Sequence, residues 1–223
     1  FDLFAFLASA KEVGGDLYDF FFLDPDHLCF TVGDVSDKGV PAALFMAITK
    51  TLIKVVAEGD TTPAGMMTKV NDELSQDNPN SMFVTLFIGI LEISTGHIHF
   101  ASGGHNPPLL IPRTGGVDYL RGVSGPMVGV IEEATFQPLE TTLRPGDAIL
   151  VYTDGVTEAM STKRELYSEE RFQASVNGLR EQEAKDIVRG AMEAVRHHAD
   201  GAPQSDDITM LCLRWYGPTG RPT

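Results

Sequence analysis

Four short acidic motifs occur along this chain, and each places an aspartate beside a glycine or at the edge of an apolar run. In order they are residues 12–16 (EVGGD), 33–36 (GDVS), 153–155 (TDG) and 205–209 (SDDIT). A carboxylate at the end of a strand is held rigidly, as a metal site requires. Hard divalent cations prefer such oxygen ligands. A fold that gathers the four motifs would therefore carry the centre of a metal-dependent hydrolase.

The net charge of −14 over 223 residues argues against two classes of binding partner, nucleic acids and anionic membranes. A nucleic-acid-binding surface needs a basic footprint, so we expect no nucleic-acid partner. The same charge argues against adsorption to an anionic membrane. We find no apolar run long enough to span a bilayer, so direct membrane insertion by this fragment is not expected. Cys29 and Cys212 lie in apolar runs, which predicts buried thiols and a reducing, cytoplasmic compartment.

Hydrophobic periodicity predicts one α+β domain over residues 1–216 and a disordered Gly/Pro-rich tail over 217–223. The chain begins without a methionine or a basic leader, which favours a first strand taken from a longer sensor or regulator protein. Helices are expected over about 40–57, 62–75, 168–178 and 181–199. Further strands are expected over 17–23, 27–35, 82–93, 97–102, 109–111, 117–120, 136–142, 148–153 and 208–215. This order indicates two antiparallel sheets packed face to face, with helix pairs outside.

Taken singly, each acidic motif also has an ordinary structural explanation. Asp34 suits a cap for the helix that follows it, and Asp154 with the next glycine is a common turn. Asp206 and Asp207 suit an exposed turn, although adjacent buried carboxylates would need a cation or a basic partner. The residues alone leave both interpretations open, and their combination favours the metal centre.

Six stretches of the chain together resemble the SpoIIE/RsbU branch of the PPM-type (type 2C-like) metal-dependent serine/threonine protein phosphatases. They are residues 11–20 (KEVGGDLYDF), 33–46 (GDVSDKGVPAALFM), 83–89 (FVTLFIG), 103–110 (GGHNPPLL), 152–159 (YTDGVTEA) and 205–209 (SDDIT). The resemblance extends from about residue 5 to residue 215. It implies an α-β-β-α sandwich, in which helix pairs flank two antiparallel sheets.

The resemblance also implies two Mn²⁺ or Mg²⁺ ions at one end of the sandwich. Asp34 would bridge both ions, and the backbone carbonyl of Val35 would complete the shell of one. Asp154 and Asp206 would hold the other ion. Asp16 would act on the ions directly or through water. Two such cations can clamp an in-line displacement at phosphorus and acidify the attacking water.

Several neighbouring residues are assigned by the same resemblance. Asp206 is preferred as the ligand, with Asp207 behind it. Lys11 is a candidate contact for the substrate phosphate, and an ordinary surface lysine is the alternative. Better-studied relatives carry a general-acid histidine where this chain has Ser36, so the resemblance assigns no side chain to protonate the leaving group. Asp37 replaces a glycine that is usual in this loop.

Histidines elsewhere receive structural interpretations. His105 is expected to stabilise a loop through hydrogen bonds to its own backbone. His197 and His198 are expected at the end of a helix, where imidazole suits the helix dipole. Residues 42–47 resemble a helix that couples regulation to metal binding in this family, and simple core packing is the alternative.

The predicted function is metal-dependent hydrolysis of phosphoserine or phosphothreonine in a protein. The metal-activated water requires no phosphoenzyme, which agrees with the absence of a cysteine in the exposed, electropositive setting of a nucleophile. The resemblance implies a phosphorylated STAS-type anti-sigma-factor antagonist as substrate in bacterial signalling, and control by homodimerisation. The alternatives are a phosphatase-like module that binds without turnover and a hydrolase of another phosphoester. No P-loop supports a nucleotide substrate.

Overall fold

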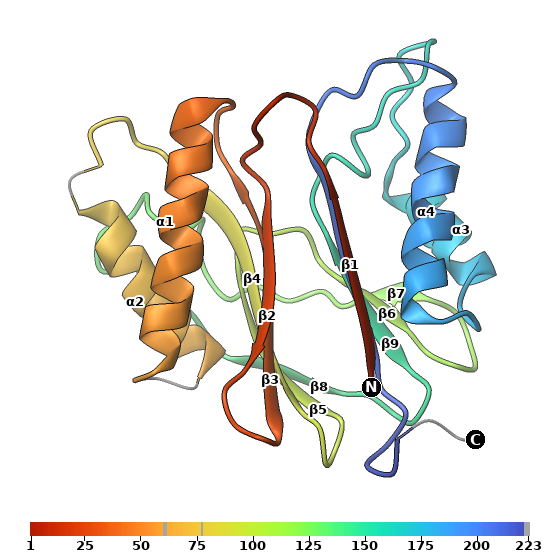
Figure 1. Ribbon diagram of the computed structural model, residues 1–223, viewed down its shortest axis with the longest axis horizontal. Coiled ribbons are helices and arrows are strands. Elements are labelled where there is room, and N and C mark those ends of the chain that lie inside the picture. The colour runs from red at the N-terminus through yellow and green to blue at the C-terminus, as the bar shows by residue number, and fades with distance from the viewer. Residues whose placement is uncertain (60–61, 77, 221–223) are drawn as a thin grey trace.

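The computed structural model describes residues 1–59, 62–76 and 78–220, which form four layers (Figure 1). The first sheet has the order β2 (Leu17–Phe22), β3 (His27–Val35), β4 (Val84–Glu92), β5 (His97–Gly103) and β8 (Leu139–Thr142). The second has the order β1 (Asp2–Ala8), β10 (Ile208–Arg214), β9 (Ala148–Tyr152), β6 (Leu109–Ile111) and β7 (Asp118–Tyr119). All strand pairs within the two sheets are antiparallel.

Two helices cover the outer face of each sheet. The helices α1 (Val40–Ala57) and α2 (Pro63–Ser75) pack on the first sheet, and α3 (Glu169–Gly178) and α4 (Ala184–Ala199) pack on the second. A third apolar layer lies between the sheets, where the rings of Phe30, Phe87 and Phe100 contact one another. Gly89 leaves room for this layer, because a Cβ there would lie 2.5 Å from the Phe30 ring. The predicted α-β-β-α sandwich is confirmed.

The strand registers bring the four acidic motifs to one end of the sandwich. Leu17 pairs with Gly33, so the residue before β2 lies beside the end of β3. Met210 pairs with Tyr152, so the turn after β9 lies beside the segment that leads into β10. In an antiparallel pair, the start of one strand meets the end of its partner. Between the sheets, the Thr153 hydroxyl donates to Asp16 and the Gly15 amide donates to Asp207, so segments more than 100 residues apart in sequence share one edge.

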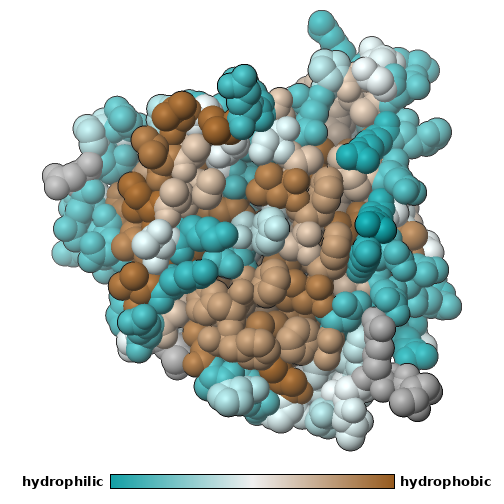
Figure 2. Space-filling model, in the orientation of Figure 1, coloured by the Kyte–Doolittle hydropathy of each residue, from teal (hydrophilic) through white to brown (hydrophobic). Residues whose placement is uncertain are grey.

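The two exposed helix faces differ in character. The α4 helix buries an apolar stripe and turns charged residues outward, as an ordinary surface helix does. The α1 helix instead exposes Val40, Leu44, Ile48 and Val55, and Figure 2 shows apolar surface along it. By length and composition α1 meets the criteria for a membrane span, so the expectation that no apolar run was long enough is wrong. The helix nevertheless packs on the first sheet through Ala42, Thr49, Ile53 and Ala57.

Most predicted elements form, and their bounds differ by a few residues. The last helix begins at Ala184 rather than near residue 181, and β8 begins at Leu139 rather than near residue 136. His197 and His198 lie in the last turn of α4, as expected. Of the tail expected to be disordered, residues 217–220 form a turn in which the Gly220 amide donates to the Gly217 carbonyl. Residues 221–223 lie outside the described part of the chain.

Candidate metal centre

Four aspartates from the four motifs converge at the edge that the registers create. Burial, together with the negative charges of Asp16, Asp154 and Asp206, raises the pKa of Asp34 to about 8. Carboxylates that shift one another's pKa lie in one neighbourhood, and those of Asp16 and Asp34 are close enough to hydrogen-bond. The structure therefore brings together the side chains that the sequence predicted as metal ligands.

Asp16 is the most deeply buried member of this cluster. Its carboxylate Oδ2 accepts a hydrogen bond of 2.7 Å from the Thr153 hydroxyl, which lies just after β9. The amide of Thr209 donates in turn to that hydroxyl oxygen, at 3.0 Å. Burial raises the pKa of Asp16 to about 7 in spite of the hydrogen bonds that it accepts. Asp16 thus joins the first sheet to the second at the centre of the site.

Asp154 follows β9 and faces the same cluster. Burial raises its pKa, and the charges of Glu158 and Asp206 add to the effect. The next residue must be glycine, since a Cβ at Gly155 would collide with the backbone carbonyl of Asp207. The Thr-Asp-Gly motif is therefore a close approach of two chain segments as well as a turn. That approach places Asp154 beside Asp206.

Asp207 has a different role from its neighbour. Its Oδ1 accepts from the Ala10 amide and its Oδ2 from the Gly15 amide, both at 2.8 Å. A Cβ at Gly14 would collide with this carboxylate, so the glycine pair in the first motif makes room for it. Asp207 consequently fixes the loop of residues 9–16, which carries Asp16, and Asp206 has the partly exposed position at the cluster.

Lys38 contacts the cluster, and the sequence interpretation did not include it among the site residues. Its Nζ lies 2.9 Å from Asp206 Oδ2 and donates to the Ser205 carbonyl at 2.8 Å. The hydrogen bond to Asp206 raises the pKa of Lys38. A signal was present, because Lys38 is the only basic side chain between His27 and Lys50, and it follows Asp34 by four residues. A lone cation in an acidic loop indicates a carboxylate or phosphate partner.

The loop after β3 is shaped by Ser36 and Asp37. The Ser36 hydroxyl accepts from the Phe83 amide at 3.0 Å, and the Ser36 amide donates to the Phe83 carbonyl at 2.8 Å. Ser36 therefore pins the loop to the start of β4. Asp37 has φ 71°, in the left-handed region where glycine is favoured, which explains why its side chain is unusual there.

The remaining predicted residues lie around the cluster. Lys11 is exposed on the loop that Asp207 fixes. The carbonyl of Val35 faces Gly15, where a Cβ would lie 3.0 Å from the oxygen. His105 is buried and hydrogen-bonds the Thr85 side chain through Nδ1 at 3.0 Å, so its main partner is another strand rather than its own loop. Burial lowers its pKa to about 4, which keeps the imidazole neutral.

The donor set suits hard divalent cations. Every converging side chain is a carboxylate, and backbone carbonyls lie close by, which is the chemistry that Mg²⁺ and Mn²⁺ prefer. Lys38 pairs with one of the four aspartates, so most of the negative charge is left without a compensating side chain among the interactions described above. Buried like charges need such compensation. Metal binding would supply it.

Proteins of known identity match this chain over nearly its whole length. Protein IcfG of Synechocystis sp. is 32% identical over 92% of this chain and 36% of its own length. Phosphoserine phosphatase RsbU of Bacillus subtilis is 26% identical over 96% of this chain and 63% of its own length. The chain thus spans about a third of the first relative and just under two thirds of the second.

A solved structure and a family profile agree with these relatives. The crystal structure of RsbU and RsbW domains from a Mycobacterium tuberculosis protein superposes with a TM-score of 0.82 at 27% identity, covering 97% of this chain and 60% of that one. The profile of the Stage II sporulation protein E family matches residues 24–216. The chain therefore belongs to the Stage II sporulation protein E (SpoIIE) family.

Proposed function

We propose that this domain hydrolyses phosphoserine or phosphothreonine in a protein, using two Mn²⁺ or Mg²⁺ ions held by the aspartate cluster. The observation that carries the proposal is the convergence of four carboxylates, two of them with pKa values raised to about 7 and about 8 by burial and mutual repulsion. Strongly perturbed groups of this kind gather at functional sites.

The residues divide into metal ligands and the groups that position them. Asp34 and the Val35 carbonyl would help to hold one ion, and Asp34, Asp154 and Asp206 would help to hold the other. When bound, the two ions activate water and neutralise the phosphoryl oxygens. Asp16 orients the cluster through its hydrogen bond from Thr153. The site is thereby preorganised before substrate arrives.

Two lysines are placed to meet the substrate phosphate. Lys38 pairs with Asp206. We propose that it turns from this carboxylate to a phosphate oxygen once Asp206 is engaged by metal. Lys11 is exposed on the loop of residues 9–16, whose Ala10 and Gly15 amides donate to Asp207, and we propose that it reaches the phosphate from there. An ammonium is a suitable phosphate partner as a point charge.

A pocket beside the cluster favours a protein substrate. It has a volume of about 220 Å³, opens next to Gly155 and Ser205, and is lined mainly by apolar side chains that include Met160 and Met192. We propose that it takes an apolar side chain next to the phosphorylated residue. We propose that this protein is a phosphorylated STAS-type anti-sigma-factor antagonist, as the family resemblance implies, and that the domain acts in the cytoplasm under the control of a homodimer.

The decisive test compares two neighbouring aspartates. Asp34→Asn should lower Mn²⁺-dependent hydrolysis of p-nitrophenyl phosphate at least about 100-fold, because the bridging carboxylate is lost. Asp37→Asn, three residues away on the exposed loop, is the matched control and should retain turnover. Equal activity of Asp34→Asn and wild type would overturn the assignment. Stability of both variants is checked by urea unfolding.

The protein-substrate proposal has its own test. Met160→Glu places a charge at the mouth of the apolar pocket, and Met160 is 45% exposed, so folding should be little affected. The variant should raise KM for a phosphoprotein substrate more than KM for p-nitrophenyl phosphate. Equal changes in KM for the two substrates would show that the pocket does not recognise the protein substrate. That result would not contradict the proposed metal centre.

A further inference from the structure

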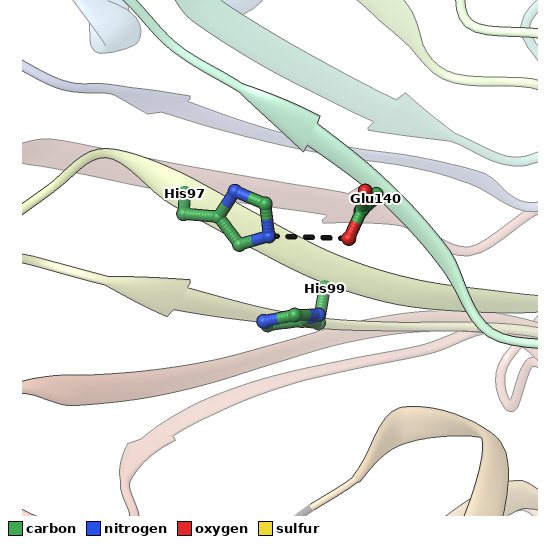
Figure 3. Close-up of side chains that lie close together, drawn as sticks. All are labelled: His97, His99 and Glu140. Atoms are coloured by element: carbon green, nitrogen blue, oxygen red, sulfur yellow. Dashed lines mark ion pairs between the residues drawn. The ribbon is translucent and has the colours of Figure 1, made fainter.

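The opposite end of the first sheet carries a second group of metal-binding side chains. His97 and His99 on β5 and Glu140 on β8 each offer a ligand atom, and these atoms all lie within 4.8 Å of one another. Figure 3 shows the two imidazoles and the carboxylate turned toward a common space. None of the three belongs to the aspartate cluster. Asp34 and His27 lie seven residues apart on β3, so the two ends are about 20 Å apart.

The strand register builds this group. His99 pairs with Glu140 and His97 pairs with Thr142, so the side chains of all four residues lie on one face of the sheet. Alternation along β5 puts the two histidines on that face with a spacing of two. The face is the one covered further along by α1 and α2, and it is exposed at His99. The sheet therefore holds the three donors without help from a loop.

The distances suit a small ion. His97 Nε2 lies 3.5 Å from Glu140 Oε2, which is longer than a good hydrogen bond. Donors about 2.0–2.2 Å from a tetrahedral ion lie about 3.4 Å apart. The ring centroids of His97 and His99 are 4.4 Å apart with the rings tilted by 70°, so the second imidazole reaches the same space. The three side chains are thus close to a coordinating arrangement before any ion arrives.

One contact outside the three donors favours coordination through a particular nitrogen. The Nδ1 of His97 lies 3.1 Å from the Thr142 hydroxyl oxygen. When Nδ1–H donates to this oxygen, Nε2 keeps its lone pair and faces Glu140. Histidine ligands in metal sites commonly donate their second ring nitrogen in this way. Thr142 thereby orients His97 for binding.

We propose that His97, His99 and Glu140 form a second metal site, selective for a transition-metal ion of the Zn²⁺ class. Two imidazoles and one carboxylate are a ligand set that binds Zn²⁺, with a fourth position open to water. Water can reach that position, because His99 is exposed and the Glu140 side chain is 71% exposed. Mg²⁺ prefers oxygen ligands and does not compete well for imidazole. The molecule then has two sites that accept different metals.

A metal ion bound at this site would link the edge strand β8 to its neighbour β5. β8 has four residues and pairs with β5 alone among the described strands of its sheet. An ion that joins β5 to β8 links the edge strand to the interior of the sheet. The segment before β8 bridges to β4 and β5 through Val128 and Gly125, so it would be held at both ends. The expected consequence is stabilisation of the fold.

The test titrates the domain with Zn²⁺ while saturating Mg²⁺ occupies the aspartate cluster. Calorimetry should show one additional Zn²⁺ per chain, and Co²⁺ in its place should give the absorption bands of a tetrahedral site. A 100-fold excess of Zn²⁺ over Kd should raise Tm by about 5–10 °C. His99→Ala should weaken this binding at least about tenfold. His197→Ala removes an exposed imidazole from α4 and should bind Zn²⁺ as wild type does.

Two results would overturn the proposal. The first is no uptake of Zn²⁺ by the Mg²⁺-saturated wild type. The second is equal Zn²⁺ affinity in His99→Ala and His197→Ala. If His99→Ala fails to fold, Glu140→Gln decides, because the Glu140 side chain is 71% exposed and its replacement leaves the core intact. Wild-type affinity in Glu140→Gln would then also contradict the site.

Discussion

The two ends of the first sheet carry two kinds of ligand set on one scaffold. At one end, the buried Asp16 and three partly buried aspartates converge, and burial together with the neighbouring charges raises the pKa of Asp34 to about 8. At the other, two imidazoles and a carboxylate from adjacent strands lie at the surface. The first set offers only oxygen, and the second offers nitrogen and oxygen. Ligand chemistry, rather than affinity alone, would separate the metals between them.

The difference also shows how each set is encoded. Each aspartate of the first set sits in a recognisable motif with glycine or serine beside it, because tight turns and close approaches are needed there. The second set has no such surroundings. His99 and Glu140 are ordinary strand residues, 41 positions apart, and only the β5–β8 register unites them. A site built from strand faces leaves little trace in the local sequence.

The largest expected effect is a loss of turnover in a variant at the aspartate cluster but not in a variant at the opposite end of the first sheet. Asp206→Ala should lower Mn²⁺-dependent hydrolysis of an aryl phosphate at least about 100-fold, since a proposed metal ligand is lost. Glu140→Ala, at the other end, should leave turnover at the wild-type level. Steady-state kinetics at saturating Mn²⁺ measures both. Similar losses in the two variants would mean that the ends are not independent.

The second effect concerns the two adjacent aspartates of the last motif. Asp207→Asn should lower the free energy of unfolding by about 2–3 kcal/mol, because charge-assisted hydrogen bonds to the amides of Ala10 and Gly15 are weakened. Asp206→Asn removes a charge from a cluster of like charges, so it should lower the free energy of unfolding by less than Asp207→Asn does. Urea unfolding in the presence of chelator compares them. Equal losses would contradict the division of roles between Asp206 and Asp207.

The third effect is the pH dependence of the metal-free protein. Burial raises the pKa values of Asp16 and Asp34 to about 7 and about 8, from 3.8. Between pH 3.8 and about pH 7–8 the folded protein therefore binds more protons than the unfolded chain. The contribution of these two carboxyl groups to the free energy of unfolding is therefore fully present below pH 3.8. It is lost as the pH rises through about 7–8.

Unfolding in chelator between pH 5 and pH 9 measures this loss. Asp34→Asn should reduce the slope, because it removes one of the two titrating carboxylates. Saturating Mg²⁺ should also reduce it, because cations neutralise the cluster. A metal-free protein that gains stability as the pH rises across this range would show that the carboxylates are not buried together.

The smallest effect lies in the loop after β3. Asp37→Gly should raise the free energy of unfolding by about 1 kcal/mol, because φ 71° suits glycine better than an L side chain. Part of the gain is offset by the greater freedom of glycine in the unfolded chain. Thermal unfolding of the variant checks this. Asp37→Ala is the matched control and should not be stabilised, because alanine keeps the Cβ.

Much of the fold followed from patterns in the sequence. The helix over 40–57 and the strand over 27–35 have the predicted bounds, because their apolar residues recur at one clear period. Boundaries were less certain where a turn precedes the element, as at Ala184. The apolar character of α1 was underestimated, since Lys50 and Lys54 interrupt its run. Local periodicity determines which element forms, but its ends depend on tertiary contacts.

The sequence by itself determined the order of the strands and helices, the four acidic motifs and the family to which they point. These features are local, so they can be read from neighbouring residues. The tertiary structure decided the separate roles of the two adjacent aspartates. The Asp207 carboxylate accepts hydrogen bonds from backbone amides, and the Asp206 carboxylate pairs with Lys38 at the cluster. It also decided that His97, His99 and Glu140 meet. Such choices depend on register and close approach between distant segments, which no local pattern specifies.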